Sequence, residues 1–159
     1  MARLIMGMAR HPGDTRVEED LSITKATLEL RIFPHQADYP VLCGTKGRVI
    51  RALQLLMELA GRRLGLEARI TLEQPSVGNR EPNLTHRPYD PVDVAHMIAK
   101  LSSILFDSAI PVIMNGTARE VHCTLDAPVR EVMLMHEAMY VYGKARGVKL
   151  KLTTKSENA

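Results

Sequence analysis

The sequence predicts an α+β fold with two small domains in tandem, each a three-stranded sheet with helices packed on one face. Apolar residues alternate with polar ones in several short stretches, as in strands, and recur every three or four residues in others, as in helices. A segment rich in Pro, Ser, Gly and Asn lies between the two halves. We therefore expect one domain over residues 1–74, a linker over 75–90, a second domain over 91–153 and a tail over 154–159.

The first half begins with a predicted pair of strands over residues 17–33, which Pro34 ends. Aliphatic residues alternate with polar ones along this pair, a pattern typical of half-buried strands. The residues that carry the alternation are Leu21, Ile23, Leu28, Leu30 and Ile32.

Two helices and a third strand complete the first half. A short apolar segment over residues 37–43 precedes two closely spaced glycines, and residues 48–64 then show a helical period. Gly65 is placed as a helix stop, and residues 66–72 alternate as a strand. The first half therefore reads strand, strand, helix, helix, strand, without a leading helix.

The second half opens with the clearest helix signal in the chain. Asp90 can cap the helix and Pro91 suits its first position, and an apolar stripe then runs to about residue 106. Two strands over 111–114 and 119–125 flank a predicted turn at Asn115-Gly116. Further along, a helix over 128–146 and a strand over 147–152 complete the predicted second domain.

Shifting the chain against itself by 82 positions aligns the two halves. Gly61 and Gly65 fall on Gly143 and Gly147, and a predicted strand follows each pair. Amphipathic helices match one another by chance, but paired glycines before a strand are harder to explain that way. We interpret the chain as an internal duplication.

Composition excludes several classes of protein. Apolar residues make up 45% and charged residues 25%, which excludes a disordered chain, and no apolar run approaches the ~18–20 residues that cross a bilayer. The N-terminal apolar stretch is too short for a signal peptide, and the two cysteines, Cys43 and Cys123, form no disulfide framework. We expect a cytoplasmic protein without a membrane partner. Its net charge of +3 is compatible with a nucleic-acid partner.

The stretch with the most chemical information is Gly44-Thr45-Lys46-Gly47, called the glycine loop below. Glycines let the backbone turn sharply, and the first amides of the following helix attract phosphate. Lys46 adds a charge that Arg48 and Arg51 extend. Between residues 44 and 72, six basic and two acidic residues give a local net charge of +4, above that of the whole chain.

The order of elements in residues 17–73 resembles the type II KH fold, and residues 41–50 resemble the KH signature, in which Ile-Gly-x-x-Gly-x-x-Ile is typical. The likeness is closest to small bacterial RNA-binding proteins of the KhpA type and to the KH domain of Jag-type proteins. Cys43 stands where that signature usually has Ile. The missing leading helix is the larger departure.

This resemblance implies a non-catalytic protein whose glycine loop clamps the backbone of about four nucleotides of single-stranded RNA or single-stranded DNA. It places Leu42, Val49, Ile50 and the last strand on the floor of the groove. The residues implied to contact the nucleic acid are Leu42, Gly44, Thr45, Lys46, Gly47, Arg48, Val49, Ile50 and Arg51.

At the corresponding place the second half reads Leu125-Asp126-Ala127-Pro128, without a glycine pair. We interpret it as a degenerate KH-like domain kept for packing, for a homodimer or for a protein partner. One alternative for the whole chain is an interaction or dimerisation module in which the glycine loop is only a turn. A weaker one is a small hydrolase that uses Cys or His. Because no metal-ligand spacing, Walker loop or dinucleotide fingerprint occurs, we expect no metal, cofactor or enzymatic activity.

Overall fold

The computed structural model describes residues 1–75, 91–106, 112–113 and 120–154. The chain divides into two compact units, Met1–His86 and Arg87–Ala159. Each unit combines a small sheet with helices, so the predicted α+β class is confirmed. Most of the expected linker, the Asn115-Gly116 turn and the tail beyond Thr154 lie outside the described residues.

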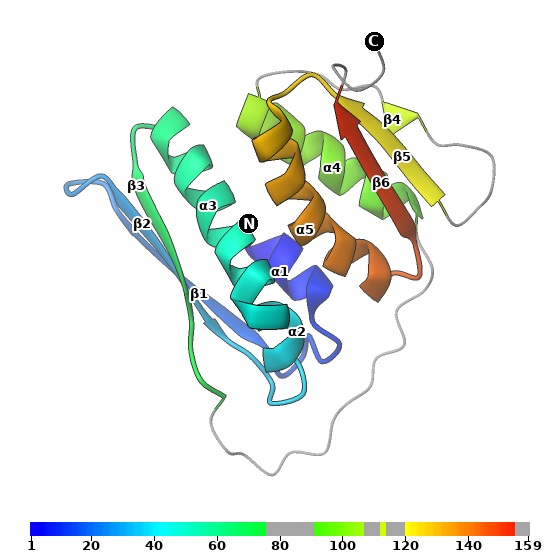
Figure 1. Ribbon diagram of the computed structural model, residues 1–159. Coiled ribbons are helices and arrows are strands. Elements are labelled where there is room, and N and C mark those ends of the chain that lie inside the picture. Colours follow the sequence, from blue (N-terminus) through cyan, green and yellow to red (C-terminus); the bar gives the residue numbers. More distant parts are fainter. Residues whose placement is uncertain (76–90, 107–111, 114–119, 155–159) are drawn as a thin grey trace. The chain divides into compact units, whose positions relative to one another are not determined.

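In the first unit, three helices and a short 3-10 turn accompany a sheet of order β1-β2-β3 (Figure 1). Strands β1 and β2 pair antiparallel, and β2 and β3 pair parallel, so α2 and α3 form the crossover between two parallel strands. The elements are α1 (Ala2–Met8), β1 (Arg16–Ser22), β2 (Thr27–Phe33), α2 (Tyr39–Cys43), η1 (Thr45–Gly47), α3 (Arg48–Arg63) and β3 (Glu67–Leu72).

The expected absence of a leading helix is wrong, because residues Ala2–Met8 form α1. This helix has only seven residues, no side-chain cap and no acidic residue in its first turn. Its own sequence therefore stabilises it weakly. Burial of Leu4, Ile5 and Met8, all with no exposed surface, stabilises it instead.

The predicted strand pair is confirmed, but the expected burial of its first members is wrong. Leu30 and Ile32 are buried, whereas Leu21 is 55% exposed and Ile23 is 85% exposed. Leu21 lies on β1, which pairs only with β2 and so forms one edge of the sheet, and Ile23 lies in the β1–β2 turn. The alternation of apolar and polar residues identified the strands correctly. It did not show which of their apolar side chains the fold buries.

The second unit contains a sheet of order β4-β5-β6, with an antiparallel pair followed by a parallel pair. Tyr142 is fully buried and donates a hydrogen bond to Asp93, which also pairs with Arg146, so these residues join the helix over Pro91–Phe106 to the helix over Val129–Ala145. Its last strand reaches Thr154, two residues beyond the predicted end. The elements are α4 (Pro91–Phe106), β4 (Val112–Ile113), β5 (Glu120–Leu125), α5 (Val129–Ala145) and β6 (Lys149–Thr154).

The two glycine pairs have the same geometry in both units. The N–H of Leu66 donates to the carbonyl of Gly61, at 2.8 Å, and the N–H of Val148 donates to the carbonyl of Gly143, at 2.9 Å. Gly65 and Gly147 follow their helices with φ of 69° and 68°. Both helices therefore end in the same left-handed turn before a strand that pairs in parallel.

Among the helices in the described part of the chain, none combines the length and the apolar character needed to span a bilayer.

Candidate functional site

The glycine loop joins α2 to α3 within the first unit. Its backbone has three residues with positive φ: Gly44 at 71°, Lys46 at 55° and Gly47 at 75°. The N–H of Gly44 donates to the carbonyl of Pro40, which ends α2, and the N–H of Gly47 donates to the carbonyl of Gly44 across the turn. The loop is therefore a tight, hydrogen-bonded turn that starts α3 at Arg48.

Gly44 is required by space as well as by its backbone angle. A Cβ built on Gly44 would lie 2.4 Å from Cγ2 of Val49 and 2.9 Å from its backbone nitrogen. At Gly47 the nearest atom to such a Cβ is Cγ2 of Ile50, at 3.9 Å. The first glycine thus allows close packing of the loop on α3, while the second only provides a left-handed residue.

The side chains of the loop and of the first turn of α3 are exposed to solvent. They are Thr45 and Lys46 in the loop, and Arg48 and Arg51 on the helix. In the part of the chain that the structure describes, Lys46 and Arg51 form no ion pair, so their charges face solvent. No acidic residue occupies the first turn of α3, and the helix dipole adds to the positive potential there.

The implied groove floor is less accessible than the resemblance suggests. Leu42 has no exposed surface and Val49 is 6% exposed, so both side chains belong to the core beneath the loop. Ile50 is half-buried. A ligand at this place would meet Ile50 and the loop backbone, and the direct contacts implied for Leu42 and Val49 stay predictions.

The local charge of +4 does not gather at one place. Arg62 lies at the far end of α3, roughly 20 Å from the loop at 1.5 Å per residue, and pairs with Glu58. Arg69 lies on β3 and pairs with Glu67. Near the glycine loop, the charges without an ion pair among the described residues are therefore those of Lys46 and Arg51.

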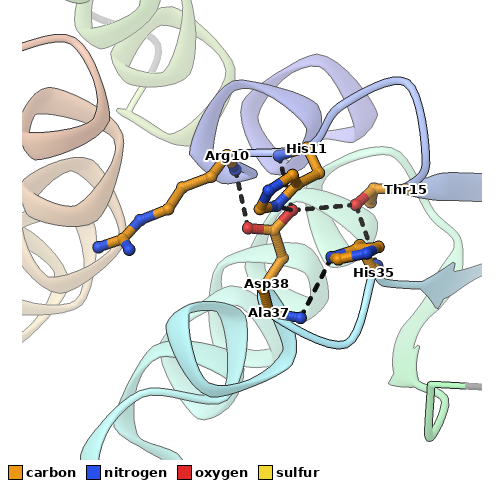
Figure 2. A network of polar contacts seen from close by, with 6 residues as sticks. All are labelled: Arg10, His11, Thr15, His35, Ala37 and Asp38. Carbon is orange, nitrogen blue, oxygen red and sulfur yellow. Dashed lines mark hydrogen bonds and ion pairs between the residues drawn. The ribbon is translucent and has the colours of Figure 1, made fainter. Parts of the chain in front are cut away.

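A buried polar network precedes the loop in the chain (Figure 2). Asp38 has no exposed surface, and its Oδ1 and Oδ2 accept hydrogen bonds from the backbone N–H groups of Arg10, at 2.9 Å, and His11, at 2.8 Å. The hydroxyl of Thr15 donates to Oδ2 at 3.5 Å and accepts from the N–H of His35 at 3.3 Å. Nδ1 of His11 lies 3.4 Å from Oδ2.

This network fixes the start of α2. Asp38 occupies the N-cap position of α2, yet its carboxylate does not cap that helix and turns instead to residues 10–15. The loop after α1, the end of β2 and the start of α2 are thereby tied together around one carboxylate. Because α2 spans only Tyr39–Cys43, its anchored start also restrains the glycine loop that follows.

Sequence reasoning missed this network, because Asp38 lies 23 to 28 positions from the residues 10, 11 and 15 that it bonds. The one local signal is an Asp two residues before Pro40, a pattern typical of a helix start. That signal points to an ordinary N-cap, which this Asp is not.

The corresponding connection in the second unit has no such loop. Strand β5 ends at Leu125 and α5 begins at Val129, with Pro128 at its N-cap. Three residues therefore replace both α2 and the glycine loop.

The described residues include few candidates for catalysis or metal binding. No group of three or more His, Cys, Asp or Glu side chains among the described residues is placed to hold a metal ion. Burial raises the pKa of the Cys123 thiol to about 11, so this cysteine is neutral and unreactive near pH 7. Comparison of the chain with protein-family models, with curated proteins and with solved structures finds no match.

Proposed function

We propose that this protein binds single-stranded RNA, or single-stranded DNA, without catalysis, through the glycine loop and the first turn of α3. The observation that carries the proposal is the backbone of the loop. Two glycines with positive φ bracket an exposed lysine at a helix start, where backbone N–H groups and the helix dipole favour a phosphate.

The order of elements in the first unit supports this proposal. It reads α, β, β, α, α, β, and the middle strand is antiparallel to the first and parallel to the last. This order of elements is the one that the type II KH resemblance implies, and the glycine loop lies between α2 and α3. Helix α1 supplies the leading helix that the sequence had not indicated.

We propose further that the second unit is a degenerate copy of the first. It has the same strand order and the same glycine geometry at the end of its crossover helix, but it lacks the clamp. Its contribution is then to packing or to a partner.

Fluorescence anisotropy with a labelled ten-nucleotide single-stranded RNA tests the binding directly. Lys46, Arg48 and Arg51 can meet about three phosphates, so the slope of log affinity against log salt should be roughly −2 for a single strand. A single-stranded DNA of the same sequence shows which backbone is preferred, and duplex RNA should compete weakly. Absence of binding to either single strand at low salt would contradict the proposal.

A second candidate, a protein-interaction or dimerisation module, is favoured by one surface of the second unit. Val129, Met133 and Tyr140 recur along α5 at intervals typical of one helix face, and they are 44%, 62% and 50% exposed. Sedimentation of the full chain with and without RNA separates the two candidates. A dimer that binds no RNA favours the module, and a monomer that binds RNA favours the clamp.

A further inference from the structure

A second feature of the first unit is a pocket at one end of its sheet. Three segments line it: residues 13–16, which lead into β1, residues 33–36, which begin with the last residue of β2, and residues 73–75 after β3. Its volume is about 680 Å³, within the range of ~300–1,000 Å³ typical of small-molecule sites. None of the residues implied by the KH resemblance lines it.

Planar groups form part of the pocket wall. The guanidinium carbon of Arg16 lies 4.6 Å from the centre of the Phe33 ring, and the two residues are cross-strand partners in the sheet. The ring of His35 packs against that of His11, tilted by 40° with the ring centres 4.4 Å apart, and His35 lines the pocket. Unpaired bases stack on aromatic rings and on arginine planes of this kind.

The polar groups of the pocket suit the edge of a base better than a phosphate. Asp14 and Glu73 are the acidic residues of the lining, and Arg16 is its one residue with a full positive charge and itself pairs with Glu18. A carboxylate only accepts hydrogen bonds, so it selects a ligand that donates. The exposed amides of Gln36 and Gln74 both donate and accept.

The Asp38 network holds this pocket in place. Thr15 and His35 line the pocket and also belong to the network. The hydroxyl of Thr15 donates to Asp38 and accepts from the backbone N–H of His35, so it connects the pocket wall to the buried carboxylate. The N–H of Ala37 donates to Nδ1 of His35 and fixes the orientation of that ring. Thr15 and His35 are thus fixed in the pocket wall by contacts within the protein, which lowers the entropic cost of binding there.

We infer that this pocket holds one unpaired base with an exocyclic amino group, from the same strand whose phosphates meet the glycine loop. Phe33 and Arg16 supply the stacking surface, and the carboxylate of Glu73 accepts from the amino group. Uracil fits less well than cytosine, because it carries a carbonyl oxygen at C4 where cytosine carries an amino group, and only its N3–H can donate to a carboxylate. This inference rests on the proposed function and adds a base preference to it.

The test compares oligocytidylate and oligouridylate, each ten nucleotides long, by fluorescence anisotropy on the full chain. The two bases have the same ring size and differ at the amino or carbonyl group. We expect the wild-type protein to bind oligocytidylate about tenfold more tightly, as one base-edge contact can provide. Phe33→Leu should lower the affinity for oligocytidylate about tenfold, the loss typical of one stacked base.

A second variant removes the carboxylate without changing the fold. Glu73→Gln has nearly the same shape, and we expect it to reduce the preference for oligocytidylate to about twofold, because an amide can accept from the amino group of cytosine and can also donate to the C4 carbonyl of uracil. Glu19→Gln, an exposed carboxylate of β1 outside the pocket, is the matched control and should leave the preference unchanged. If Phe33→Leu sharply lowers the melting temperature, its loss of affinity no longer reports on stacking, and the base preference of Glu73→Gln then tests the inference.

The results distinguish failure of this inference from failure of the proposed function. Equal affinity of the wild-type protein for the two oligonucleotides, or an unchanged preference in Glu73→Gln, overturns the base pocket. If charge reversal in the glycine loop still weakens both complexes equally, the proposed function survives that result. Absence of binding to either oligonucleotide overturns both.

Discussion

The backbone N–H of His11 donates a 2.8 Å hydrogen bond to Oδ2 of Asp38, 27 residues further along the chain. The second carboxylate oxygen accepts from the N–H of Arg10, so one fully buried aspartate satisfies two successive backbone donors. Backbone donors left without a partner in a protein interior cost about 1–3 kcal/mol each. Asp38 thus stabilises the loop after α1 and, through α2, the glycine loop.

We therefore predict that Asp38→Ala strongly destabilises the first unit. The substitution leaves the N–H groups of Arg10 and His11 without an acceptor, and we expect a loss of about 3 kcal/mol in the free energy of unfolding. Urea denaturation monitored by circular dichroism measures it. Asp20→Ala, at an exposed carboxylate on β1, is the control and should change the stability by less than about 0.5 kcal/mol. Similar losses in both variants would show that the network contributes little.

The two glycines of the loop should respond differently to the same substitution. Gly44→Ala places a Cβ 2.4 Å from Cγ2 of Val49 at a positive φ, and we expect it to cost about 3 kcal/mol. Gly47→Ala meets no atom closer than 3.9 Å, so only backbone strain of about 1 kcal/mol remains. The difference between their thermal unfolding midpoints checks this. Equal midpoints would mean that the loop does not pack on α3 as described.

Cys123 should resist alkylation in the native protein. Its pKa is raised to about 11, so below about pH 10 the thiol is almost entirely protonated and is also shielded by burial. With iodoacetamide at pH 8, we expect only the half-buried Cys43 to react in the native state and both cysteines to react in urea. Mass spectrometry of the peptides identifies the modified residue, and rapid native modification of Cys123 would contradict its burial.

The sequence predicted the elements better than it predicted what surrounds them. Strands and long helices follow from local periodicity, which is why the ranges around β1, β2, α3 and β3 are correct to within two residues. Helix α1 was missed because burial of Leu4, Ile5 and Met8, and not local propensity, stabilises it. Leu21 was expected to be half-buried, since alternation cannot show that β1 is an edge strand.

The same distinction applies to the candidate site. The glycine loop is local, so its position and the sharp turn at its two glycines follow from four consecutive residues, whereas the positive φ of Lys46 was not predicted. The Asp38 network and the pocket beside Phe33 join segments that are distant in sequence, and no short motif marks them. The contacts of these polar loop residues can therefore be identified only in the folded structure, where the distant segments come together.

The variant Thr45→Asp/Lys46→Asp tests the proposed clamp. It preserves both glycines, and Asp tolerates the positive φ of Lys46, so the fold should persist. The chain offers a matched control, because Thr24-Lys25 is the same dipeptide, exposed in the β1–β2 turn. The backbone N–H of Glu67, at the start of β3, donates to the carbonyl of Ala26 in that turn. Since α3 begins at the glycine loop and ends just before β3, the turn and the glycine loop are separated by about the length of that helix. Thr24→Asp/Lys25→Asp therefore makes the identical charge change at a distant place.

The most direct measurement is the affinity of these two variants and the wild-type protein for one single-stranded RNA, at one salt concentration. We predict that Thr45→Asp/Lys46→Asp loses about 2 kcal/mol, or more than tenfold in affinity, through repulsion of phosphate and loss of the lysine. The control variant should stay within about threefold of the wild-type protein, because weak long-range repulsion alone remains. Equal affinity of the folded loop variant and the wild-type protein, or equal losses in both variants, would contradict the clamp.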